Sequence, residues 1–261
     1  MSEPDKNTLQ PIVEVNNFTM VFGDKTIVDN LSFVVNRGEI FGFLGSNGSG
    51  KTTTIRALLG IYPPTDGQLL IDGEPFSVER QLRIGYLPEE RGLYKKETVI
   101  DVMTYFGQLK GLTKKQAQKF TNNYLASVDL AEHAGTIIDK LSGGQQQKIQ
   151  LGIAVMNNPE LLILDEPTKG FDPVNRRLLM GIIRNFHQQG TTVIMISHQM
   201  DEVEKICDRI LLLKNGHAVE YGDVSAIKKK HGGKSIDSIF VSIYGQPDDV
   251  DISKLVSEQN R

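Results

Sequence analysis

The chain has little cysteine, which limits the chemistry that it can perform. Cys207 is the only cysteine among 261 residues, so an intrachain disulfide and a cluster of cysteine metal ligands are excluded. We expect the Cys207 thiol to be a small buried apolar group. A single cysteine fits a protein of a reducing compartment such as the cytosol.

The chain also has little net charge and no long apolar run. A formal net charge of -3 and a pI of about 6.0 provide no general electrostatic field for nucleic acid or anionic lipid. The longest apolar runs, such as Ile210 to Leu213, are far shorter than the roughly 18 residues of a membrane-spanning helix. The polar, acidic N-terminus lacks the pattern of a signal peptide. If a membrane is involved, we expect another chain to cross it.

What the chain does have is an alternation of predicted strands and helices. Apolar and β-branched segments near the N-terminus predict a sheet, and helical spacing then predicts a mainly helical insertion. Val102, Tyr105, Phe106 and Leu109 share one face there. A strand, helix, strand order after the insertion predicts a parallel sheet covered on both faces. The segments are strands at 12–15, 28–35, 39–44, 68–72, 161–164, 192–196 and 209–214, and helices at 51–59, within about 95–157, near 176–189 and near 200–207.

The glycine-rich segment that follows strand 39–44 matches the P-loop pattern, with an apolar strand before it and a helix after it. Its residues are Gly45, Ser46, Asn47, Gly48, Ser49, Gly50, Lys51 and Thr52, and Thr53 follows directly. Backbone N–H groups of such a loop surround phosphate oxygens. We expect Lys51 to reach the β- and γ-phosphates of a nucleotide and the Thr52 hydroxyl to ligate Mg²⁺. The alternative is a glycine-rich turn with a solvated lysine.

Polar side chains follow two of the predicted strands at the point where each strand ends. Asp165 and Glu166 come directly after the apolar run 161–164, and His198 follows strand 192–196. Ligands of open α/β sheets bind at the carboxyl ends of strands. We therefore expect Asp165 to hold the metal, Glu166 to deprotonate a water molecule, and His198 to contact the γ-phosphate. Without the P-loop, these residues would be interpreted as solvated loop residues.

A second pair of glycines lies at the start of a predicted helix. Ser142 and Gln145 predict a capping box, with Gly143 and Gly144 in the first turn, where each glycine costs about 0.8 to 1 kcal/mol relative to alanine. Without Cβ atoms, these residues leave backbone N–H groups open to a phosphate, which the helix dipole attracts. The alternative is a capping box with a flexible entry.

These motifs together resemble one family. In chain order they are a Walker A loop, the sequence LSGGQ, a Walker B strand, Asp172 within the segment 169–173, and His198. The set is similar to the nucleotide-binding subunits of the ATP-binding cassette (ABC) family over about residues 12–222. The resemblance implies an α/β P-loop NTPase core with a mixed, largely parallel sheet, an N-terminal antiparallel β subdomain and an inserted helical subdomain at about 95–157. It implies an ABC domain over 1–222 and a short C-terminal extension over 223–261.

The resemblance also implies site residues and cofactors. ATP and Mg²⁺ are expected, and two subunits are expected to pack head to tail. Each ATP would lie between the Walker A loop of one chain and the partner's LSGGQ segment, which includes Ser142, Gly143, Gly144 and Gln145. Phe22 matches the aromatic residue that stacks on adenine; the alternative is a core residue at a strand end.

The chain departs from the family pattern at three positions. Glu89 stands where glutamine is usual, and we expect its carboxylate to face Mg²⁺ and water. Phe171 stands where leucine is usual beside Asp172, and Phe22 where tyrosine is usual. The segment from Gly85 to Tyr94 resembles the branch that serves bacterial sodium-, drug- and peptide-export systems. Many members of that branch have a longer C-terminal domain, so we do not expect regulation by such a domain here.

The function implied by the resemblance is ATP hydrolysis that drives export through a separate transmembrane permease. The partner would be this permease together with a second ABC ATPase chain, in a homodimer or heterodimer at the inner face of the cell membrane. No direct nucleic-acid partner is expected. One alternative is a soluble ABC ATPase that acts on ribosomes or DNA; the single uninterrupted cassette disfavours it. Another alternative is a P-loop kinase, which the LSGGQ sequence disfavours. A third is a nucleotide-sensing module without turnover, which Glu166 disfavours.

Overall fold

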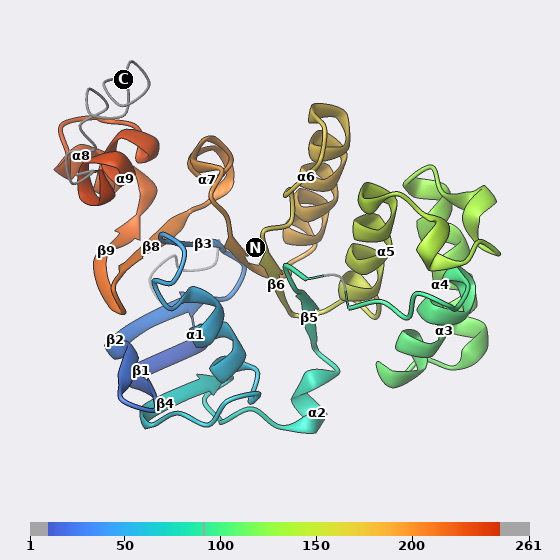
Figure 1. The fold of residues 1–261 in the computed structure, drawn as a ribbon, viewed down its shortest axis with the longest axis horizontal. Helices are drawn as coiled ribbons and strands as arrows, with labels where there is room; N and C mark the ends of the chain where they lie inside the picture. Colours follow the sequence, from blue (N-terminus) through green and yellow to red (C-terminus); the bar gives the residue numbers. More distant parts are fainter. Residues whose placement is uncertain (1–9, 91, 246–261) are drawn as a thin grey trace, which may run out of the picture.

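The structure is a computed structural model that describes residues 10–90 and 92–245 (Figure 1). Arg91 in the Gly85 to Tyr94 segment, the first nine residues, and part of the C-terminal extension, 246–261, lie outside the described residues. The strands are β1 (Pro11–Phe22), β2 (Lys25–Asn36), β3 (Ile40–Leu44), β4 (Asp66–Ile71), β5 (Ile84–Leu87), β6 (Leu161–Asp165), β7 (Thr192–Ile196), β8 (Arg209–Lys214) and β9 (His217–Asp223). The α-helices are α1 (Lys51–Leu58), α2 (Val78–Gln81), α3 (Val99–Leu109), α4 (Lys114–Ser127), α5 (Gly143–Val155), α6 (Pro173–Gln188), α7 (Met200–Ile206), α8 (Val224–Lys230) and α9 (Ile236–Tyr244).

The described residues form a central sheet of six strands in the order β5-β6-β7-β3-β8-β9, in which β9 alone is antiparallel to its neighbour. The middle residues of its central strands are apolar and buried because both faces of the sheet are covered. Leu161 and Ile163 of β6 pack into one core, and Leu162 and Leu164 pack into the other. The predicted parallel α/β sheet is therefore confirmed, with one antiparallel edge strand.

The N-terminal strands described form a second, antiparallel sheet in the order β2-β1-β4. Its apolar side chains share one core with α1 and with one face of the central sheet. Ile55, Ala57 and Leu58 supply the helix residues of this core. Figure 1 shows α1 beside this sheet. The predicted N-terminal antiparallel β subdomain is confirmed, but strand 39–44, expected in the same N-terminal sheet, belongs to the central sheet as β3, between β7 and β8. The core fixes the start of α1 relative to the end of β3.

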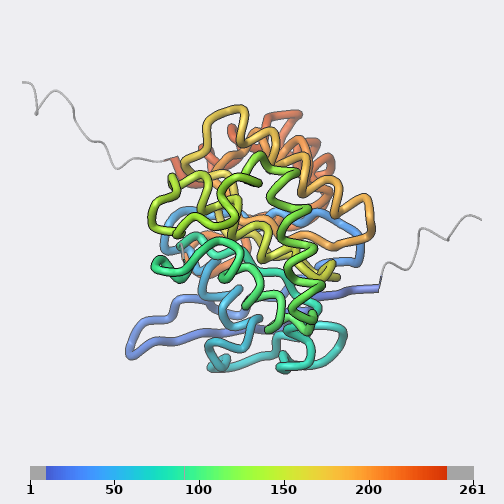
Figure 2. Tube along the Cα trace, turned by 90° about the vertical axis from the view of Figure 1, so that its right-hand side faces the viewer, coloured from blue at the N-terminus to red at the C-terminus, as the bar shows by residue number. Residues whose placement is uncertain are grey.

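The segment between β5 and β6 is mainly helical, as predicted. Helices α3, α4 and α5 lie together at one end of the molecule, and Figure 2 looks onto this end. Side-chain caps start all three helices: Thr98 caps α3, and capping boxes start α4 (Thr113 with Gln116) and α5 (Ser142 with Gln145). The predicted apolar face of α3 is only partly buried: Val102 is buried, whereas Tyr105 and Leu109 are exposed.

Five elements are not predicted by the sequence patterns: α2, β5, β9, α8 and α9. Strand β5 is only four residues long and contains Gly85, where a Cβ atom would lie 2.3 Å from the Ala154 carbonyl oxygen of α5. The polar segment after Gly222 forms helices because Ser235 caps α9, and Ile236 and Ile239 are buried against the central core. Among the described residues, none of the helices has the length and apolar character needed to cross a bilayer.

Candidate functional site

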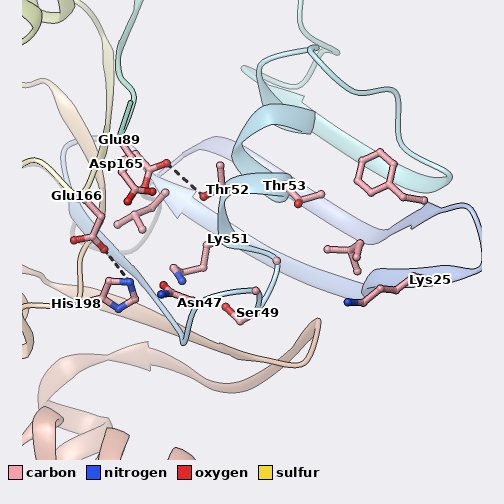
Figure 3. A pocket seen from close by; sticks show the side chains of 15 residues that line it. Lys25, Asn47, Ser49, Lys51, Thr52, Thr53, Glu89, Asp165, Glu166 and His198 are labelled. Carbon is pink, nitrogen blue, oxygen red and sulfur yellow. Dashed lines mark hydrogen bonds and ion pairs between the residues drawn. The ribbon is translucent and has the colours of Figure 1, made fainter. Parts of the chain in front are cut away.

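The carboxyl ends of strands β6 and β7 and the loop that follows β3 border a cavity of about 380 Å³ (Figure 3). It brings together residues that are far apart in the sequence, because parallel strands end at the same edge of a sheet. The lining residues are Phe22, Lys25, Ile27, Asn47, Gly48, Ser49, Gly50, Lys51, Thr52, Thr53, Glu89, Asp165, Glu166, Ile196 and His198. Most of the nucleotide and metal residues predicted from the sequence therefore share one cavity.

The loop before α1 holds Lys51 in place with its own backbone. The Lys51 ammonium donates hydrogen bonds to the carbonyl oxygens of Gly45 and Ser46, at 2.8 and 3.0 Å, so these two predicted residues support the lysine from behind. Gly50 starts the helix at φ 110° without a side-chain cap. A Cβ atom at Gly50 would lie 2.8 Å from a Val28 methyl carbon. The loop thus leaves the first N–H groups of α1 open to an anionic ligand.

Asp165 and Glu166 are two buried acids at the end of β6. Burial is the main cause that raises the pKa of Asp165 to about 6 and the pKa of Glu166 to about 7. The Thr52 hydroxyl lies 3.4 Å from Asp165 Oδ2. Burial also lowers the pKa of His198, so its ring is neutral near pH 7.

Glu166 has two unusual structural features. Its backbone has φ 50°, a strained conformation for a residue with a side chain. His198 Nε2 lies 3.3 Å from Glu166 Oε1, but the geometry is not that of a hydrogen bond. This buried oxygen therefore has no hydrogen-bond partner among the described residues. A strained acid with an unpaired oxygen in a cavity is suited to accept a proton from a bound molecule.

The oxygen atoms of the cavity fit a magnesium ion that is also bound to phosphate. Thr52, Glu89 and Asp165 line the same cavity. Within residues 10–90 and 92–245, no three His, Cys, Asp or Glu side chains form a ligating group. Mg²⁺ usually keeps several waters and binds one or two carboxylates plus substrate phosphates. The donor set therefore suits a metal that arrives with a nucleotide.

The predicted capping box at the start of α5 is confirmed. Ser142 Oγ accepts a hydrogen bond from the Gln145 N–H at 3.3 Å, and the Ser142 N–H donates to Gln145 Oε1 at 2.8 Å. Gly143 and Gly144 occupy the first turn. None of these four residues lines the cavity, and Figure 1 shows α5 and α1 well apart. The fold of one chain does not bring LSGGQ to the Walker A loop.

Phe22 lies at the cavity and not in a core. Its side chain is 46% exposed, and its ring packs edge-on against Tyr62 with the centroids 5.3 Å apart. The alternative of a core residue at a strand end is therefore wrong. Cys207 is buried, as expected.

The sequence patterns did not predict Lys25, Ile27 and Ile196, which line the cavity, or two residues that contact its lining from outside. Lys169, between β6 and α6, donates to Glu89 Oε1 at 2.7 Å. Tyr244 at the end of α9 donates to the Leu213 carbonyl oxygen, and its own oxygen lies near the Ser46 N–H. A Cβ atom at Gly45 would lie 2.5 Å from the same Leu213 oxygen. Helix α9 therefore supports the phosphate loop from behind. The sequence signal for this helix is the aromatic pair Phe240 and Tyr244, which are four residues apart.

We expect the charge of Glu166 to destabilise the protein in the absence of nucleotide and metal. The pKa of Glu166 in the folded chain, about 7, is above the ordinary value of 4.5. Between pH 4.5 and pH 7 the folded chain therefore binds more protons than the unfolded chain. The free energy of unfolding should therefore fall as pH rises from about 4.5 to 7. Glu166→Gln should raise the stability by about 1 to 3 kcal/mol at pH 8 and by little at pH 4.5.

Thermal unfolding at the two pH values in EDTA would measure this difference. The matched control is Glu160→Gln, a half-exposed acid just before the other end of β6. An equal change in the unfolding temperature of Glu166→Gln at pH 8 and pH 4.5 would contradict the role of the buried charge.

Comparison with known proteins identifies the family. A family model described as ABC transporter matches residues 28–169. An uncharacterized ABC transporter ATP-binding protein of Methanocaldococcus jannaschii is 44% identical over 222 residues, which cover 85% of this chain and 81% of that protein. Nod factor export ATP-binding protein I of Sinorhizobium fredii is 35% identical, with coverage of 89% and 68%.

Among solved structures, an ATP-binding subunit of an ABC transporter superposes with a TM-score of 0.84 at 26% identity, over 89% of this chain and 99% of that chain. The sequence matches and the superposition agree on the fold and on the family. The protein belongs to the ABC transporter family, as an ATP-binding subunit with the ATPase fold of that family.

Proposed function

We propose that the chain hydrolyses ATP in a head-to-tail dimer and thereby drives export through a separate membrane permease. The observation that carries this proposal is the cavity that contains Lys51, Asp165 and Glu166 while the capped start of α5 lies outside it. The start of α5 would then be available to a nucleotide on a second chain. The name of the Sinorhizobium relative supports the export direction.

In this proposal each element of the cavity has one task. The backbone of 45–53 and the Lys51 ammonium bind the phosphates, and Phe22 packs on the base. Glu166 Oε1 accepts the proton of the attacking water, and the neutral His198 ring contacts the γ-phosphate. Thr52, Asp165 and Glu89 would hold Mg²⁺, which when bound offsets the phosphate charge.

The permease would bind at an exposed surface of the helical region. Tyr94, Tyr105 and Leu109 are exposed there, and a cavity of about 350 Å³ beside the two tyrosines is also bordered by Glu97 and Asp101. Exposed aromatic and apolar side chains beside acids suit a partner segment with apolar and basic side chains. The chain would thus be held at the inner face of the membrane, with 1–222 as the ATPase domain, about 95–157 as its helical subdomain and 223–261 as an extension.

Purification from cells that also express the permease encoded beside this chain tests the proposal. We expect a polytopic membrane protein to co-purify in detergent, and Tyr105→Asp to abolish this while ATP binding is kept. The control is Val78→Asp on α2, an exposed apolar position outside the helical region. Co-sedimentation with ribosomes and no membrane partner would instead support the soluble alternative.

A further inference from the structure

An ion pair joins two loops at the wall of the nucleotide cavity. Lys169 Nζ lies 2.7 Å from Glu89 Oε1. Glu89 follows β5, Lys169 follows β6, and these strands are parallel neighbours in which Leu87 pairs with Leu164. The ion pair therefore connects two loops that leave the sheet at the same edge, where Figure 3 shows Glu89 close to the Asp165 side chain.

Glu89 adds a third carboxylate to a cavity that must accept an anion. Asp165 and Glu166 are the other two, and all three side chains line the same cavity. Lys51 is a buried cation that the Gly45 and Ser46 carbonyls already bind. Within the described part of the chain, Glu89 has no other ion-pair partner than Lys169.

This arrangement explains how a glutamate can stand where the family usually has an uncharged glutamine. We propose that Lys169 is a positioning residue, which holds Glu89 against the cavity wall and offsets its charge so that nucleotide phosphate can bind. The proposal rests on the proposed nucleotide site. The two residues act as one unit, so the importance of Lys169 depends on the charge at position 89.

A double-mutant cycle on nucleotide affinity tests this dependence. The probe is a fluorescent ATP analogue titrated in EDTA, so that the readout is binding and not turnover, with Lys169→Met, Glu89→Gln and the double variant. We expect Lys169→Met to weaken binding roughly two- to fivefold, the range of a partly exposed ion pair. In the Glu89→Gln background, the same change should have an effect below about 1.5-fold.

Two further measurements separate an electrostatic role from a general structural one. The loss in Lys169→Met should diminish between about 50 and 500 mM salt because exposed charges are screened, and Lys169→Arg should bind nearly as well as the unaltered chain. Lys115→Met, which removes an exposed cation on α4, is the control and should not change the affinity.

Each outcome supports or overturns the inference. The inference is overturned if Lys169→Met lowers nucleotide affinity equally with glutamate and with glutamine at position 89. It is also overturned if salt does not reduce this loss of affinity. Lys51→Ala in the same titration separates failure of the proposed nucleotide site from failure of the inference about Lys169. If Lys51→Ala binds the ATP analogue normally, the nucleotide site itself is misassigned. If Lys51→Ala loses binding while the effects of Lys169→Met and Glu89→Gln are additive, only the inference about Lys169 fails.

Discussion

Glu166→Gln should reduce ATP hydrolysis by about 10²- to 10⁴-fold while leaving ATP binding intact. An amide of the same shape cannot accept the proton of the attacking water, whereas it can occupy the same buried position. Because burial disfavours the charged acid, the neutral variant should fold at least as well. ATP should therefore accumulate unhydrolysed on the protein, and the dimer should persist in size-exclusion chromatography with ATP.

Three observations would decide the role of Glu166. Phosphate release measures hydrolysis, and retention of radiolabelled ATP measures binding. Glu160→Gln, just before the opposite end of β6, should hydrolyse ATP at the rate of the unaltered chain. Normal hydrolysis by Glu166→Gln would remove this residue as the base and leave the unpaired Oε1 atom without a function.

Gly144→Asp should reduce the rate of ATP hydrolysis by at least about 100-fold. Each single chain should still bind ATP with an affinity within about twofold of that of the unaltered chain. Gly144 lies in the first turn of α5 and outside the cavity that contains Lys51. A carboxylate in this turn would repel the phosphate of a partner's nucleotide. It would at the same time favour the helix, because acids near a helix N-terminus interact well with its dipole, and only the Phe171 ring, 3.3 Å from an added Cβ atom, must shift slightly.

A mixing experiment makes the prediction for Gly144 sharper. In a head-to-tail dimer, one chain with Gly144→Asp and one chain with Lys51→Ala together contain one intact site, made from the Walker A loop of the first and the LSGGQ segment of the second. Mixing two inactive variants should restore part of the hydrolysis. Gly135→Asp, at an open position of the same region, is the control. No recovery on mixing, or loss of ATP binding by folded Gly144→Asp, would contradict a shared site.

The motifs of this chain could be predicted because each depends on local chemistry. The strand of Leu161 to Leu164, the turn at Gly50 and the cap of Ser142 with Gln145 are determined by neighbours within a few residues, and the structure has all three. The central strands were predictable from their uninterrupted apolar runs. Strand β5 was not, because four residues with a glycine carry little periodic signal.

The arrangement of the site depended on contacts between distant segments. Phe22 could have been a core residue by its pattern, and only the fold places it in the cavity wall. The support that Tyr244 gives to the phosphate loop depends on how α9 packs on the central core, which no local pattern encodes. Likewise, the exposure of Tyr105 and Leu109 results from how many helices cover α3.

By itself, the sequence determined that this chain has a phosphate loop, an acid pair, a capped helix with two glycines and a single cysteine, because these features depend on residue type and short spacing. The tertiary structure decided which of them meet: Lys51, Asp165 and Glu166 do, and the start of α5 does not. It also provided Lys169 as the partner of the unusual Glu89. The physical reason is that a parallel sheet brings the ends of distant strands to one edge, so the charges at the site become neighbours only in the folded chain.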